Sequence, residues 1–103
     1  MNVLFVSPSY PTEMPEFVRG LAEVGARVWG IGPEPAGQLP AMTRRHLAGY
    51  LQVPNLFDGD DVVRRVRKWL RGKEIDRVEC LAEYFVLLAA KLREAFGVPG
   101  LTV

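Results

Sequence analysis

Residues 76–103 read DRVECLAEYFVLLAAKLREAFGVPGLTV, and this stretch decides the fold. A short apolar run over residues 78–82 stops at an acid, Glu83, as expected for a buried strand that ends at the edge of a sheet. Apolar residues at helical spacing follow over 84–96, and Gly97-Val98-Pro99-Gly100 stops that pattern. The stretch therefore predicts a strand, an acidic residue at its end, a helix and a glycine-rich turn.

Further strands are predicted along the rest of the chain. Continuous apolar runs are typical of strands in a parallel sheet, because such strands are buried on both faces. Runs of this kind cover residues 2–6, 27–31, 50–53 and 77–81, and residues 101–103 begin either a fifth strand or a linker. Residues 32–40 contain too many prolines and glycines for regular structure.

Helices are predicted between these strands. Thr12 can cap a helix that ends at Gly25, and its buried stripe is expected to consist of Phe17, Val18, Leu21 and Val24. A short helix is predicted over 41–47. A clear amphipathic helix begins at Asp58 and ends at Gly72, with Val62, Val66, Trp69 and Leu70 on its apolar side.

The alternation of strands and helices predicts an α/β fold. We expect one domain over residues 1–103 with three layers: a Rossmann-like parallel sheet of strand order 3-2-1-4 and helices on both of its faces. In such a sheet, ligands bind beyond the carboxyl ends of the strands, at the point where the strand order reverses. Here that point lies between the first and fourth strands.

The loops at this reversal point contain the candidate substrate-binding residues. These loops are residues 7–12 and 82–84, and the candidates are Ser7, Ser9, Tyr10, Glu83 and Tyr84. A carboxylate at this position can receive a cationic or hydrogen-bond-donating group of a substrate; alternatively, Glu83 only satisfies the free amides of the following helix. The hydroxyls of the first loop either contact a ligand or belong to a turn around two prolines.

Several functional classes find no support in the residues. The single cysteine, Cys80, is expected to be a buried strand residue, and with His46 the only histidine there is no metal-ligand cluster and no pair for nucleophilic catalysis. We assign no catalytic residue. The net charge of +1 argues against a nucleic-acid partner. No apolar run approaches the length of a membrane span, and no leader peptide is recognisable. The sequence therefore predicts a cytoplasmic protein with no membrane contact.

Two surfaces of the predicted fold are candidates for binding a partner. Apolar residues surround most of the first half of helix 84–96, which indicates cover by a second subunit, by a further domain, or by the other helices of this domain. A homo-oligomer through this helix is one expectation. The other surface is the basic side of helix 58–72, which either binds a phosphate-rich partner or, more commonly, is simply solvated (Arg64, Arg65, Arg67, Lys68 and Arg71).

Three parts of the chain together resemble a known family. They are the opening strand NVLFV, the third-strand region that ends in Val53-Pro54, and residues 76–100 with Glu83 and the Gly-Val-Pro-Gly turn. This combination resembles the pre-ATP-grasp domain, the N-terminal α/β domain of ATP-grasp ligases such as the biotin carboxylases and the carboxylate–amine ligases. The resemblance spans residues 2–103, so the chain is expected to be an N-terminal fragment.

The resemblance implies a ligase that uses ATP and Mg to convert a carboxylate into an acyl phosphate and then joins it to an amine or another nucleophile. A missing C-terminal ATP-grasp domain would hold the nucleotide and the metal, so no cofactor is expected on the fragment, which would be inactive alone. Glu83 is the position that the resemblance carries over to the substrate cleft.

Two other functional classes stay open. Residues 3–32 are similar to the start of glycosyltransferases with two Rossmann-like domains, although the loop after the first strand lacks the glycine-rich stretch those enzymes usually have. A non-catalytic oligomerisation module is the other alternative, because of the apolar last helix.

Overall fold

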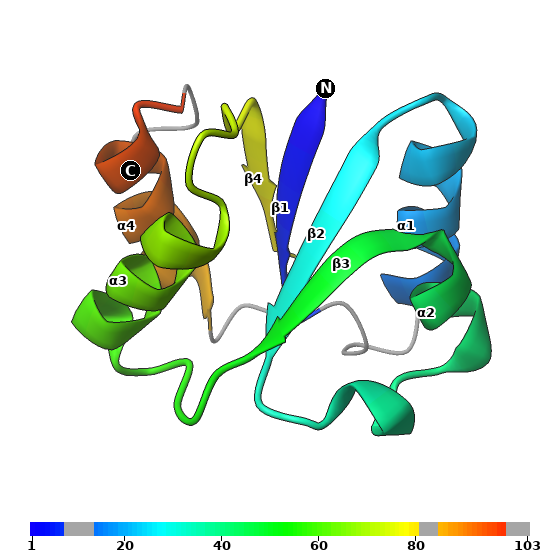
Figure 1. Ribbon diagram of the computed structural model, residues 1–103, viewed down its shortest axis with the longest axis horizontal. Coiled ribbons are helices and arrows are strands. Elements are labelled where there is room, and N and C mark those ends of the chain that lie inside the picture. The colour runs from blue at the N-terminus through cyan, green and yellow to red at the C-terminus, as the bar shows by residue number, and fades with distance from the viewer. Residues whose placement is uncertain (8–13, 81–84, 99–103) are drawn as a thin grey trace.

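The computed structural model describes residues 1–7, 14–80 and 85–98, and these form a four-stranded parallel sheet with helices on both faces (Figure 1). The strands are β1 (Asn2–Val6), β2 (Arg27–Gly32), β3 (Leu47–Gln52) and β4 (Arg77–Glu79), in the spatial order β3-β2-β1-β4. Both the α/β class and the predicted order 3-2-1-4 are confirmed.

Strand β1 lies at the centre of the sheet because its residues are apolar on both faces. Val3, Leu4, Phe5 and Val6 are all fully buried. Leu4 pairs with Trp29 of β2 on one side and with Val78 of β4 on the other. A continuous apolar run therefore identified the central strand correctly.

The helices form two pairs on opposite faces of the sheet (Figure 1). Helices α1 (Met14–Glu23) and α2 (Ala41–His46) cover one face, and α3 (Gly59–Trp69) and α4 (Val86–Phe96) cover the other. The core under α3 and α4 includes Leu4, Val6, Val66, Leu88 and Leu92, whereas Phe5, Val18 and Val28 pack together under α1.

Local chemistry explains where α3 and α4 begin and end. The carboxylate of Asp58 accepts a hydrogen bond from the Asp61 backbone N–H at 3.2 Å, which caps the start of α3. Gly97 ends α4 in a left-handed conformation with φ +66°, and its N–H reaches the last carbonyls of the helix. Gly25 and Gly72 also have positive φ, as their predicted roles as helix stops require.

Several predicted details are wrong. Strand β3 begins at Leu47 rather than at residue 50, because Gly49 is a strand residue whose missing side chain makes room for Trp29: a Cβ there would lie 2.9 Å from the Trp29 ring. Val24 follows the end of α1 and is 81% exposed, so it is not part of the buried stripe. Cys80 follows β4 instead of lying in it, and it is half-buried.

The loop between β2 and α2 also differs from expectation. Residues 36–38 form a short 3₁₀ helix, η1 (Ala36–Gln38), inside a segment that was expected to lack regular structure. In the described residues 1–7, 14–80 and 85–98, no helix combines the length and apolar character that a bilayer span requires.

Candidate functional site

The carboxyl ends of all four strands meet at one edge of the sheet, the lower edge in Figure 1. The strand order reverses between β1 and β4, and these two strands lie side by side there: Phe5 of β1 pairs with Glu79, the last residue of β4. The chain therefore leaves the sheet at neighbouring points after β1 and after β4. This is the geometry in which an open α/β sheet binds its ligand.

Ser7 lies at this point in an unusual conformation. It is the first residue after β1, it has φ +58°, and it is only 4% exposed. Its backbone N–H donates a hydrogen bond to the carbonyl oxygen of Ile31 at 2.8 Å, which extends the pairing of β1 with β2 by one residue. A left-handed serine costs on the order of 1–3 kcal/mol, and such strain is concentrated at functional sites.

The other four candidate site residues lie outside the described residues. Ser9 and Tyr10 come two and three positions after Ser7 in the sequence, and Glu83 and Tyr84 come after β4. The β1–β4 pairing brings the starting points of both loops together. Of the five predicted site residues, Ser7 is the one whose position the structure describes, and it lies at the predicted edge.

A polar cluster at the same edge was missed in the sequence. The single O–H of Tyr50, in β3, is shared between two acceptors of Glu34: the carbonyl oxygen at 2.8 Å and, at the longer distance of 3.3 Å, the carboxylate. Gln52 Nε2 donates to the Pro33 carbonyl oxygen at 3.2 Å. Two side chains of β3 thus hold the segment that follows β2.

The cluster has little room to rearrange. A Cβ on Gly32 would lie 2.6 Å from the Tyr50 hydroxyl and 2.7 Å from the Glu34 carboxylate, so the hydroxyl rests against bare backbone. Burial, and then the negative charge of Glu34, raises the pKa of Tyr50 above its ordinary value. The hydroxyl therefore stays protonated and remains a donor to Glu34. The sequence could have indicated Glu34 as a site residue. It follows the predicted second strand, and residues that follow a strand of a parallel sheet lie at its carboxyl edge.

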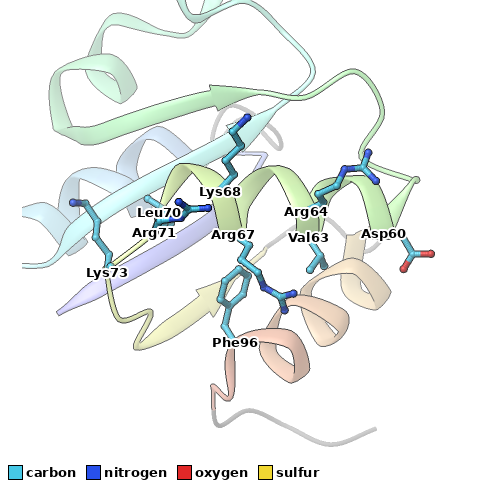
Figure 2. Close-up of a pocket in the computed structure, with 10 residues that line it drawn as sticks. Asp60, Val63, Arg64, Arg67, Lys68, Leu70, Arg71, Lys73 and Phe96 are labelled. Carbon is cyan, nitrogen blue, oxygen red and sulfur yellow. The ribbon is translucent and has the colours of Figure 1, made fainter.

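Two hollows lie outside the carboxyl edge itself. One, of about 660 Å³, follows the solvent-facing side of α3 and reaches Phe96 of α4; basic side chains surround it (Figure 2). The other, of about 280 Å³, lies between the segment before α3 and the start of α4. Its lining includes Phe57, 73% exposed, and Leu87, 82% exposed.

Among the residues that the structure describes, no three His, Cys, Asp or Glu side chains come together as a metal site would require. The chain's one histidine, His46, instead uses its Nδ1 within α2, where it lies 2.8 Å from the Met42 carbonyl oxygen. Compared with known proteins, the chain matches no protein-family model and no curated protein sequence.

Proposed function

We propose that this chain is the substrate-side N-terminal domain of an ATP-dependent ligase of the ATP-grasp type. In this proposal a C-terminal ATP-grasp domain follows Val103 and holds ATP and Mg. That domain activates a small-molecule carboxylate as an acyl phosphate, which is then joined to an amine or another nucleophile. The class of reaction rests on the resemblance of residues 2–6, 53–54 and 76–100 to pre-ATP-grasp domains. A ligase that consumes ATP and carboxylate metabolites would work in the cytoplasm.

The single observation that supports the proposal is the strained Ser7 at the reversal point of a 3-2-1-4 sheet. Ser7 is buried and left-handed at the carboxyl end of β1, next to the strand whose loop contains Glu83. A glycine would occupy this conformation without strain, so a serine here supports the proposal that its hydroxyl has a role in the site.

Each candidate residue has a role in the proposal. Glu83 would accept hydrogen bonds from, or pair with, a donor group of the substrate, and Tyr84 would flank it. The hydroxyls of Ser7, Ser9 and Tyr10 would form the opposite wall of the cleft. The domain supplies binding and orientation, and none of its residues takes part in the phosphoryl transfer.

The first test reads the gene in frame beyond the codon for Val103. An open frame of roughly two hundred codons or more, the size of a further domain, is expected, with a lysine soon after this point and a late pair of acids. A stop codon directly after Val103 would overturn the ligase proposal. The isolated chain should hydrolyse no more ATP than a heat-killed sample.

The second test uses the protein that the gene encodes. Incubation with Mg-ATP, a set of carboxylates and hydroxylamine traps an acyl phosphate as a hydroxamate. Glu83→Gln should raise the KM for the carboxylate, which this assay measures because hydroxylamine replaces the nucleophile, whereas Glu94→Gln, which removes a carboxylate from the exposed side of α4, should behave as wild type. Hydroxamate formation that is equally insensitive to both changes would contradict the role of Glu83.

A specific observation favours a second candidate, a non-catalytic oligomerisation module. Phe57, Val86 and Leu87 are exposed beside one another around the start of α4, and the rings of Phe57 and Phe85 lie 5.2 Å apart. Light scattering on the chain tests this candidate: the module is expected to self-associate with no dependence on ATP, and a strict monomer would contradict it.

A further inference from the structure

The groove along α3 combines positive charge with apolar surface. Arg67 extends toward α4 and lies over Phe96, while Lys68 projects from the opposite side of α3 (Figure 2). Between the charged side chains the lining is apolar: Val63 and Phe96 are half-buried and keep some apolar surface exposed, and Leu70, only 3% exposed, belongs to the core beneath them. The whole lining is Asp60, Val63, Arg64, Arg67, Lys68, Leu70, Arg71, Gly72, Lys73 and Phe96.

The positive charge of the groove is not neutralised locally. Asp61 pairs with both Arg64 and Arg65, and Asp60 pairs with Lys91 of α4. No acidic residue occurs between positions 62 and 73. Within the described part of the chain, no carboxylate forms an ion pair with the four remaining bases: Arg67, Lys68, Arg71 and Lys73.

Two of these four bases rest on aromatic rings instead. The Arg67 guanidinium lies 5.8 Å from the centre of the Phe96 ring, and the Lys73 ammonium lies 5.3 Å from that of Trp29. The negative end of the α3 dipole also favours bases in the last turn. Val63 and Phe96 pack against the core and still leave part of their surface among the bases, and the apolar side of an amphipathic partner would cover that part.

We propose that this groove binds an acidic amphipathic helix of a partner protein. Its carboxylates would pair with the four bases, and its apolar side would cover the exposed parts of Val63 and Phe96, as in helix-in-groove recognition. A nucleic acid is disfavoured, because a phosphate backbone offers nothing apolar to this floor and the Phe96 ring already contacts Arg67. The proposal does not depend on the ligase function.

The probe is a synthetic helical peptide of about 18 residues, or roughly five turns, with leucines at helical spacing and with glutamates and alanines elsewhere. A peptide of the same composition in scrambled order tests whether the apolar stripe matters. A single-stranded oligothymidylate tests the nucleic-acid alternative. Fluorescence anisotropy measures the affinity of each labelled probe for the chain at low and at high salt.

A pair of matched variants locates the binding. Lys68→Glu with Arg71→Glu reverses two exposed bases of the groove, and Arg44→Glu with Arg45→Glu makes the same change in charge at exposed positions of α2, on the other face of the sheet. All four positions are exposed, so both double variants should fold, which circular dichroism checks.

We expect the amphipathic peptide to bind with a Kd on the order of 10–100 μM at low salt and more weakly as salt rises. The groove variant should weaken this binding at least about tenfold, which corresponds to 1.4 kcal/mol, and the α2 variant by less than about twofold. The proposal fails if the peptide does not bind, if the scrambled peptide binds equally well, or if both variants weaken binding alike. Tighter binding of the oligothymidylate would overturn it in favour of a nucleic acid.

Discussion

Helices α3 and α4 lie side by side on one face of the sheet, and their buried sides are alike although their solvent sides are opposites. Val62 and Val66 of α3 and Leu88 and Leu92 of α4 enter the same core. Outward, α3 presents bases, whereas α4 presents Leu87, which is 82% exposed. The buried stripe determines where a helix packs. The residues on its solvent side can differ without changing that packing, so they can be suited to different partners.

The two helices are also held by different means. Local interactions stabilise the start of α3, where Asp58 caps the helix and Asp61 pairs with Arg64 and Arg65. The start of α4 has no side-chain cap at Phe85, and the helix is instead tied to β4 by the Arg93 guanidinium, which donates to the Val78 carbonyl oxygen at 2.6 Å. Packing should therefore matter more for α4, and local chemistry more for α3.

Truncation of the shared core should have the largest effect. Leu92→Ala removes a fully buried side chain of α4, and we expect it to lower the free energy of unfolding by about 3 kcal/mol. Val66→Ala, the corresponding change in α3, should cost about 2 kcal/mol because fewer carbons are removed. Urea denaturation measures both. A smaller loss for Leu92→Ala than for Val66→Ala would contradict the expectation that the loss follows the number of buried carbons removed.

The helix ends should give the next largest effects. Gly97→Ala forces a side chain into the left-handed conformation that ends α4, which should cost about 1–2 kcal/mol. Asp58→Ala removes the cap of α3 and should cost about 1 kcal/mol. Gly37→Ala serves as the control, because Gly37 is exposed with open space around it and its φ is not positive. Equal losses at positions 37 and 97 would refute the role of the left-handed conformation.

The exposed apolar side of α4 should matter for association rather than for stability. Leu87→Lys should change the free energy of unfolding by less than about 0.5 kcal/mol, because the side chain is already in solvent. If copies of the chain associate through α4, the variant should shift the light-scattering mass toward the monomer. Gln38→Lys adds the same charge at an exposed position of η1 and should leave the mass unchanged. An equal shift in mass for both variants would mean that the added charge, and not the apolar side of α4, causes the dissociation.

The fold was predictable because its signals are local and repeated. The apolar run of β1 and the stripe of α4 each follow from the periodicity of burial, and glycines mark the helix ends at positions 25, 72 and 97. The start of β3 was missed because Gly49 weakens a strand pattern, and its reason for being there is Trp29, 20 positions earlier in the chain. A contact between residues this far apart in the chain produces no periodic pattern in the sequence.

For the candidate site, the sequence predicted the position of Ser7 and not its conformation. The strand order and the reversal rule placed Ser7 at the carboxyl edge, but they could not give its left-handed conformation, because a serine in the sequence does not indicate a positive φ. The hydrogen bond between Tyr50 and Glu34 joins residues from the ends of two different strands, so their contact cannot be recognised from the sequence neighbourhood of either residue. Glu83 lies outside the described residues, and its role stays a prediction.

The smallest effect should come from the ion pair that joins the two helices. Lys91 Nζ of α4 lies 2.7 Å from an Asp60 carboxylate oxygen of α3, and both side chains are largely in solvent. The hydrogen bond and the charge of Lys91 lower the pKa of Asp60, and Asp60 in turn raises the pKa of Lys91. The ion pair thus stabilises the fold over a limited pH range. Its contribution is lost as pH falls through the lowered pKa of Asp60 and as pH rises through the raised pKa of Lys91.

Asp60→Asn should therefore lower the urea midpoint slightly at neutral pH, and the difference from wild type should disappear in acid and shrink at high salt. Asp60 also lies in the first turn of α3, so this variant loses a favourable interaction with the helix dipole as well. A double-mutant cycle with Lys91→Met separates the two contributions, because the dipole effect survives in the Lys91→Met background and the pair does not. A coupling of zero would mean that this ion pair contributes nothing to holding α3 against α4.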